Sequence, residues 1–205
     1  MIAKVVATSL LLVLLGGCQT PPGRLWNSTA SQDQFTDQVT KMVTIGEWRS
    51  DTTIVTRSLR YYPFVGVQDG EIYVGIRSGG KHRIPTGTVQ IRIDDNKAWT
   101  ISPDETPVYL VPSLPKTPIA APPGMTELVE KTTAQAMNNA AKMMSPYTAA
   151  TGDKAKSIIK EMLTGKVVKY RTVGFNQAAS TTGEVNIDES FAQSLREIGI
   201  APESL

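Results

Sequence analysis

The sequence has very few of the residues on which nucleophilic catalysis and zinc binding depend. Its 205 residues include a single cysteine, Cys18, and a single histidine, His82. A structural zinc site usually takes about four Cys or His ligands. A Ser-His-Asp arrangement would have to use His82, which lies in a glycine-rich stretch between Lys81 and Arg83. We therefore predict a protein without a cofactor that is not an enzyme.

An excess of charge of one sign is also missing. The chain has 21 Lys and Arg against 19 Asp and Glu, a net charge of +2, and no block of like charges. Proteins that bind nucleic acid usually present a basic patch or arm. We therefore expect no nucleic-acid partner, while the hydrophobic content of 40% is typical of a globular protein.

The most informative segment is the amino terminus. After Lys4, residues 5–15 form a mostly apolar run. This run is shorter than the roughly 20 residues of a membrane span and typical of a signal-peptide core. The run ends in Leu15, Gly16, Gly17 and Cys18. These four residues resemble the lipobox of bacterial lipoproteins, in which a leucine and two small residues precede the modified cysteine.

The resemblance implies a lipoprotein signal peptide over residues 1–17 that is cleaved before Cys18. The cysteine sulfur would carry diacylglycerol, and the new amino group would carry an acyl chain such as palmitate. Two or three such chains hold a protein to a membrane without a transmembrane helix. Gln19 in place of the aspartate that retains lipoproteins in the inner membrane indicates the periplasmic face of the outer membrane. An ordinary signal with a coincidental cysteine and an uncleaved anchor are the alternatives.

The mature chain is expected to begin with a tether and a helix. Residues 18–30 contain prolines, Gly23, Ser28 and Thr29, which predicts a lipidated, flexible tether. A capping box at Ser31 and Gln34, followed by apolar residues at helical spacing, predicts a helix over residues 32–44.

Residues 31–205 are expected to form a single α+β domain, of which residues 50–112 are the β-rich half. Val89, Ile91 and Ile93 alternate with polar residues, as in a strand with one solvated face. Three short segments are typical of turns: Asp69-Gly70, Gly79-Gly80 and Asp94-Asp95-Asn96. They indicate consecutive hairpins in one antiparallel sheet with flanking helices. Residues 111–124 contain five prolines and predict an extended crossover.

Residues 125–205 are expected to form the second half, with three helices and a strand pair. A helix over residues 126–144 would bury its apolar side, a second would begin at Asp153 and end at Gly165, and Asp188 would cap a third. The stretches LTGKVVKYRTVGFN and VNIDESFAQSLREIGI loosely resemble the end of periplasmic proteins of the invasion-associated locus B type. That resemblance implies a strand pair leading to a short helix and no functional residues.

The stretch GIRSGGKH, residues 75–82, comes close to a nucleotide-binding P-loop. Gly75, Gly80 and Lys81 have the required spacing, but His82 replaces the hydroxyl residue that would bind magnesium. A P-loop must also be followed by a helix, whereas an alternating strand pattern follows here. We expect no nucleotide, and a hairpin turn whose basic tip, Lys81, His82 and Arg83, contacts an anionic envelope group.

Two sets of residues could hold a metal ion, although a purely structural role is more typical of both. Asp94 and Asp95 could supply oxygen ligands, but the Asp-Asp-Asn triplet favours a tight turn. Met137, Met143 and Met144 could supply thioether ligands for Cu(I), but methionine on an alanine-rich helix is usually core filler. We expect no metal site.

The functional hypothesis is a non-enzymatic lipoprotein, anchored in the outer membrane, that binds a protein or an envelope component. A cluster of aromatic residues in the β-rich half is the candidate contact surface, above all Tyr61, Tyr62 and Phe64, with core packing as the alternative that is more typical of most of them. One alternative is an envelope enzyme that acts on glycan or peptide with turn carboxylates such as Asp69, Glu71 or Asp104. Another is a phage-type exclusion lipoprotein that blocks a receptor.

Overall fold

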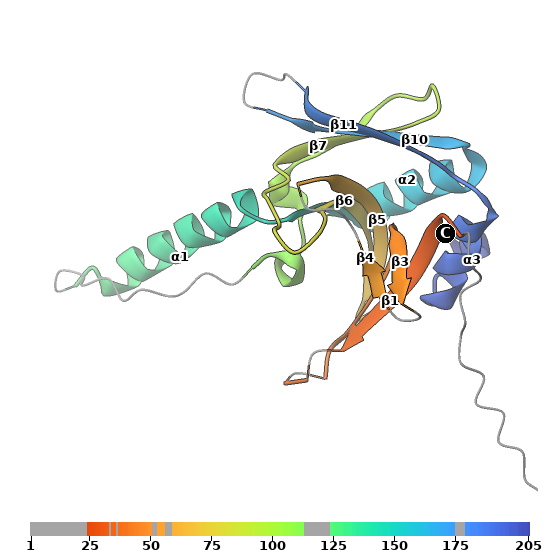
Figure 1. Cartoon of the computed structure of the whole chain (residues 1–205). Helices are drawn as coiled ribbons and strands as arrows, with labels where there is room; N and C mark the ends of the chain where they lie inside the picture. Colours follow the sequence, from red (N-terminus) through yellow and green to blue (C-terminus); the bar gives the residue numbers. More distant parts are fainter. Residues whose placement is uncertain are drawn as a thin grey trace, which may run out of the picture.

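The computed structural model describes residues 24–32, 34–35, 37–50, 53–55, 59–112, 124–174 and 179–205 (Figure 1). The predicted signal peptide, Cys18 and most of the predicted proline-rich crossover lie outside these residues. The strands are β1 (Trp26–Gln32), β2 (Val39–Ile45), β3 (Glu47–Ser50), β4 (Thr53–Val55), β5 (Tyr61–Gln68), β6 (Glu71–Ser78), β7 (Thr88–Ile93), β8 (Trp99–Ile101), β9 (Tyr147–Thr151), β10 (Val167–Val173) and β11 (Ala179–Asn186). The helices are α1 (Thr126–Met143), α2 (Gly152–Thr164) and α3 (Glu189–Glu197), with 3-10 turns η1 (Pro103–Glu105), η2 (Val108–Leu110) and η3 (Pro202–Ser204).

The predicted α+β fold is confirmed, but the strands form two main antiparallel sheets. The first sheet has the order β1-β2-β5-β6-β9, and the second sheet has the order β11-β10-β7-β8. A separate hairpin pairs β3 with β4. The Asp69-Gly70 turn joins β5 to β6, and its positive φ angles of 51° and 82° suit a two-residue hairpin.

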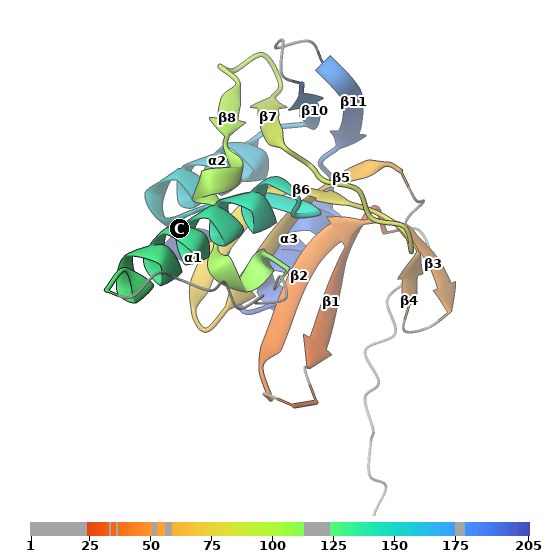
Figure 2. The ribbon, with the colours of Figure 1, turned by 90° about the vertical axis from the view of Figure 1, so that its left-hand side faces the viewer.

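The main core lies where the two sheets and two helices meet. Helix α2 packs on β6 and β9, and α3 packs on β1 and β2. Figures 1 and 2 show α2 beneath the second sheet, whose opposite face has no described helix over it. The core combines alternating residues of the strands, such as Val74, Ile91 and Val168, with Ile158 of α2 and Leu195 of α3. Each sheet therefore has one face in the main core. The other face of the first sheet carries a second, smaller core of Phe64, Tyr73, Leu110 and Ala149.

The predictions for residues 24–44 are wrong. Residues 26–30, predicted as part of the tether, belong to β1, and the predicted helix over residues 32–44 is a hairpin of β1 and β2 with a short loop. The side chain of Trp26 is fully buried in the main core, and β2 pairs with β1 on one side and with β5 on the other. Burial of a tryptophan and pairing with β5 outweigh the local helical spacing.

The Gly79-Gly80 prediction is also wrong. Strand β6 pairs with β5 and β9, whereas β7 pairs with β8 and β10, so Gly79 and Gly80 begin a crossover between the two sheets. The amide of Gly79 donates to the carbonyl of Arg60 at 2.8 Å. As predicted, the GIRSGGKH stretch is followed by a strand, β7.

Helix α1 begins and ends as predicted, but its apolar side is not in the core. Met143 and Met144 are about half exposed, Leu128 is 60% exposed, and Ala141 is the residue of α1 that is buried. In both views the helix projects away from the sheets (Figures 1 and 2). The described part of the chain contains no helix that is long and apolar enough to cross a membrane.

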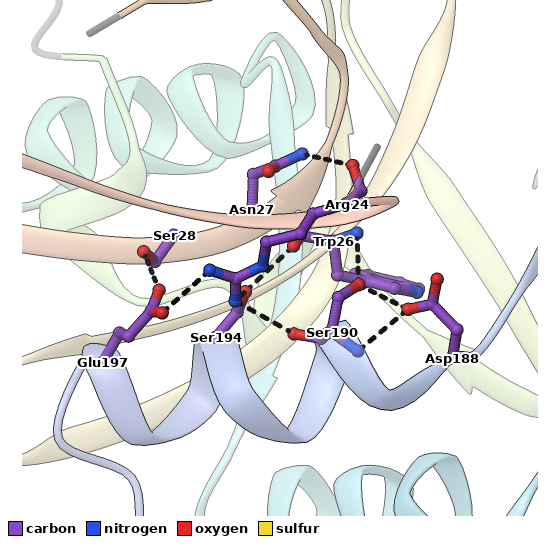
Figure 3. Close-up of polar contacts among 8 residues, drawn as sticks. All are labelled: Arg24, Trp26, Asn27, Ser28, Asp188, Ser190, Ser194 and Glu197. Carbon is purple, nitrogen blue, oxygen red and sulfur yellow. Dashed lines mark hydrogen bonds and ion pairs between the residues drawn. The ribbon is translucent and has the colours of Figure 1, made fainter. Parts of the chain in front are cut away.

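The first described residues are fixed to α3 by a network of polar contacts (Figure 3). Arg24, whose side chain is 8% exposed, donates to Glu197 Oε1 and to Ser194 Oγ, each at 2.8 Å. The backbone of Trp26 donates to Ser190 Oγ at 2.9 Å and accepts from Ser194 Oγ at 2.9 Å. Arg24 is therefore already part of the folded body.

Glu197 makes this junction sensitive to acid. Partial burial raises the pKa of its carboxyl group, but hydrogen bonds from Ser28 and Arg24, together with the charge of Arg24, outweigh burial and leave the pKa below its usual value. The stabilisation by Glu197 is therefore present above the unfolded-state pKa of about 4.3 and is lost as the pH falls through the lower folded-state pKa.

We expect Glu197→Gln to lower the free energy of unfolding by about 1 kcal/mol at neutral pH, a figure reduced for the solvent around this side chain. The difference from the wild type should shrink at an acidic pH below the folded-state pKa, where the wild-type carboxyl is protonated. Urea denaturation at neutral and at acidic pH measures the loss and its dependence on pH. Glu203→Gln, which removes an exposed ion pair with Arg196, is the control, and equal losses in both variants would contradict the prediction.

Candidate functional site

The predicted basic tip lies in the crossover that follows β6. Lys81, His82 and Arg83 are exposed, as a contact surface requires. Arg83 is held by β9, because its Nη1 donates to the hydroxyl of Tyr147 at 2.8 Å and its guanidinium lies 5.5 Å from the centroid of that ring. Any role of this segment in binding an anion stays a prediction.

A second arginine, Arg77, lies near this segment. Its Nε donates to Thr44 Oγ1 at 3.4 Å. Burial lowers the pKa of the Arg77 guanidinium; Tyr147 raises it in part, and the positive charge of Arg83 lowers it further. The two arginines are thus close enough to influence each other, and both contact Tyr147.

The three predicted aromatic residues have different positions. Phe64 is fully buried, with its ring 5.8 Å from those of Tyr73 and Tyr147, so the prediction that it contacts a partner is wrong. Tyr61 is half-buried and joins the sheets: its hydroxyl donates to Pro85 O at 2.9 Å, and its carbonyl accepts from Tyr170 at 3.0 Å. Tyr62 is half-buried. Phe64 fills the second core because alternate β5 residues face opposite sides of the sheet.

The turn carboxylates lie on different elements. Asp69 accepts from the Gln38 amide at 3.0 Å, and Glu71 accepts from the Tyr109 hydroxyl at 2.8 Å, at the turn between β5 and β6. Asp104 lies in η1, where its carbonyl accepts from Lys142. Their use in catalysis stays a prediction.

The strongest candidate site is on the open face of the second sheet. We call it the basic face, and define it as Gln90, Arg92, Lys169, Arg171, Thr182 and Glu184, which line a hollow of about 610 Å³. Lys169 lies opposite Arg92 on β7 and Glu184 on β11. Arg171 lies opposite Gln90 and Thr182.

Hydrogen bonds orient two of the three cations. Arg92 Nε donates to the carbonyl of Asn96 at 2.9 Å, which fixes it to the turn between β7 and β8. Arg171 Nε donates to Gln90 Oε1 at 2.7 Å, and the Gln90 amide donates to Thr100 Oγ1 at 3.1 Å. The Arg171 side chain is therefore positioned before any ligand is present.

The arrangement is suited to an anion. Like charges directly opposite each other on neighbouring strands destabilise a sheet, yet Arg92 and Lys169 are such a pair, and Arg171 follows on the same face. Guanidinium groups bind phosphate and carboxylate through two parallel hydrogen bonds, and a lysine adds a mobile charge. Glu184 is the one acid among the described residues that line this hollow.

Sequence reasoning missed the basic face. Arg92 alternates with Ile91 and Ile93, and Lys169 and Arg171 flank Tyr170, so the pattern indicated that each set faces solvent. The missing information was the pairing of β7 with β10, because the two strands are more than 70 residues apart and their register cannot be read locally.

The two metal candidates lie in a turn and at the end of an exposed helix. The Asp94 carboxylate accepts from the backbone amides of Lys166 and Val167, at 3.1 and 2.9 Å, and the predicted turn between β7 and β8 is confirmed. Met143 and Met144 are exposed on α1, so their prediction as core filler is wrong. In the residues that the structure describes, no group of three or more His, Cys, Asp and Glu side chains is placed to hold an ion.

Comparison with known proteins does not assign the chain to a family. No family model, curated protein or solved structure matches the chain.

Proposed function

We propose that this protein is a lipid-anchored envelope protein that binds an anionic partner on the basic face and catalyses no reaction. The observation that supports the proposal best is the gathering of Arg92, Lys169 and Arg171 on one open sheet face. The partner carries phosphate or carboxylate groups, as an acidic protein surface or an anionic envelope polymer does.

The anchor is proposed at Cys18, on the periplasmic side of the outer membrane. Because Arg24 is fixed to α3, five residues, 19–23, separate Cys18 from a fixed part of the chain. An extended chain spans at most about 3.6 Å per residue, so this link brings the body within about 20 Å of the lipid. The bound partner must then be reachable close to the membrane.

A charge-removal experiment tests the basic face. We expect Lys169→Gln with Arg171→Gln to weaken binding to inorganic polyphosphate or polyglutamate at least about tenfold, or about 1.4 kcal/mol. The matched control is Lys156→Gln with Lys160→Gln, which removes the same charge from exposed positions of α2. Fluorescence titration of the mature chain with Cys18→Ala gives the affinities at one fixed salt concentration.

Equal weakening in both double variants would contradict the site, because it would mean that only net charge matters. In cells, the full-length chain should incorporate labelled palmitate and remain with the outer membrane, and Cys18→Ala should lose both properties. The variant with Lys169→Gln and Arg171→Gln should keep the label. An unlabelled wild type would contradict the anchor and leave the basic face to be judged by the titration.

A further inference from the structure

A second hollow lies on the other main sheet, between the loop that joins β1 to β2 and the 3-10 turn η2. We call it the glutamine hollow. It has a volume of about 560 Å³, and its lining includes Gln32, Gln34, Phe35, Gln38, Gln68 and Tyr109. These residues come from β1, the loop, β5 and η2, so the site exists only in the folded chain. It shares no lining residue with the basic face.

Carboxylates on the rim hold two of the amide side chains. Gln32 Nε2 donates to Asp37 Oδ1 at 3.2 Å, and Gln38 Nε2 donates to Asp69 Oδ2 at 3.0 Å. An amide with its nitrogen engaged in this way still offers its oxygen as an acceptor. The rim acids therefore orient the lining and do not themselves line the hollow.

The aromatic side of the hollow is held in a similar way. The hydroxyl of Tyr109 donates to Glu71 Oε2 at 2.8 Å, and its ring lies 5.8 Å from that of the buried Tyr73. Tyr109 is 37% exposed, and Phe35 in the facing loop is 97% exposed. The hollow thus has a fixed, partly exposed ring on one side and a second ring in the loop.

This chemistry selects a class of ligand. None of the described lining residues carries a charge, whereas acids surround the rim, so an anion would be repelled. A purely apolar ligand would take the exposed amide oxygens of Gln32 and Gln38 away from water without a new hydrogen bond. An uncharged ligand with many hydroxyl groups and a flat C–H face satisfies the amides and packs on the rings. We infer that the glutamine hollow binds an uncharged oligosaccharide segment.

Isothermal titration of the mature chain with Cys18→Ala tests this inference. The probes are three tetrasaccharides, chitotetraose, cellotetraose and maltotetraose. We expect saturable binding of at least one, weakened at least about tenfold by Tyr109→Ala and by Gln38→Ala, the latter removing an exposed amide. Tyr109→Phe keeps the ring and should lose less affinity than Tyr109→Ala. The variant with Lys169→Gln and Arg171→Gln should bind as the wild type does.

Three outcomes overturn the inference. The first is that no tetrasaccharide shows saturable binding, and the second is that Gln38→Ala and Phe35→Ala both leave the binding unchanged. The third is that the variant with Lys169→Gln and Arg171→Gln no longer binds. Because Gln38 and Phe35 are exposed, their variants remain informative if Tyr109→Ala does not fold. The inference does not depend on the lipid anchor or on the anionic partner.

Discussion

Replacement of Gly75 by alanine is expected to destabilise the protein by about 3 kcal/mol, at the upper end of overpacking costs. Gly75 is the first glycine of the GIRSGGKH stretch, and it lies opposite Ala149 where β6 pairs with β9. A methyl group on Gly75 would lie 2.7 Å from the Cα atom of Ala149 and still closer to the carbonyl oxygen of Thr148. Both are backbone atoms, so strand β9 itself must move.

Urea denaturation measures this loss, and Gly199→Ala is a matched control. Gly199 follows α3 with a φ angle of 89°, and a methyl group there would meet no atom within 4 Å. Its replacement should cost only the backbone strain of a left-handed residue, about 1 to 2 kcal/mol. A smaller loss for Gly75→Ala than for Gly199→Ala would contradict a close approach of β9. Gly75 therefore allows β6 and β9 to pack closely, a role that its place in a P-loop-like spacing does not indicate.

The parts of the fold that follow local signals could be predicted from the sequence. Asp188 caps α3 through a hydrogen bond to the amide of Ser190, and Gly165 follows α2, as expected. The strand pair β10 and β11 and the Asp69-Gly70 turn were predicted for the same reason. In each case the physical cause lies within a few residues of the element, in a cap, a turn or an alternating pattern.

The parts that depend on distant partners could not be predicted. The spacing of Phe35, Val39 and Val43 also fits a helix. Residues 39–45 form a strand because they pair with β5, which is distant in the sequence. Helix α1 has an apolar side, but no local signal shows that the body leaves it exposed. The division into two sheets at Gly79 likewise depends on which strands β6 and β7 find as neighbours.

The same limit applies to the two candidate sites. Alternation predicted that Arg92 and Arg171 each face solvent, but their meeting on one face follows from the register of β7 and β10. The glutamine hollow brings Gln38 near Tyr109 from segments about 70 residues apart. Binding surfaces on antiparallel sheets are assembled across strands, so their composition is visible only once pairing is known.

In the proposed lipoprotein, the amino-terminal junction sets how near the membrane the body lies, and this junction depends on Trp26. We expect Trp26→Ala to lower the free energy of unfolding by about 3 to 5 kcal/mol, as for other buried tryptophans. The side chain is fully buried, its ring lies 4.8 Å from that of Phe191, and its Nε1 donates to Asn186 O at 2.9 Å. The variant would lose both this packing and the connection of β1 to the end of β11.

Thermal and urea denaturation of the mature chain with Cys18→Ala measure the effect, with Phe35→Ala as the control. Phe35 is an aromatic residue of the same amino-terminal region, but it is 97% exposed, so its removal should change stability by less than about 0.5 kcal/mol. If Trp26 belonged to a flexible tether, the two variants would be equally harmless. That result would mean that the flexible link after Cys18 is longer than five residues, so the body would not have to lie within about 20 Å of the lipid. The reason to place the partner close to the lipid would then be lost.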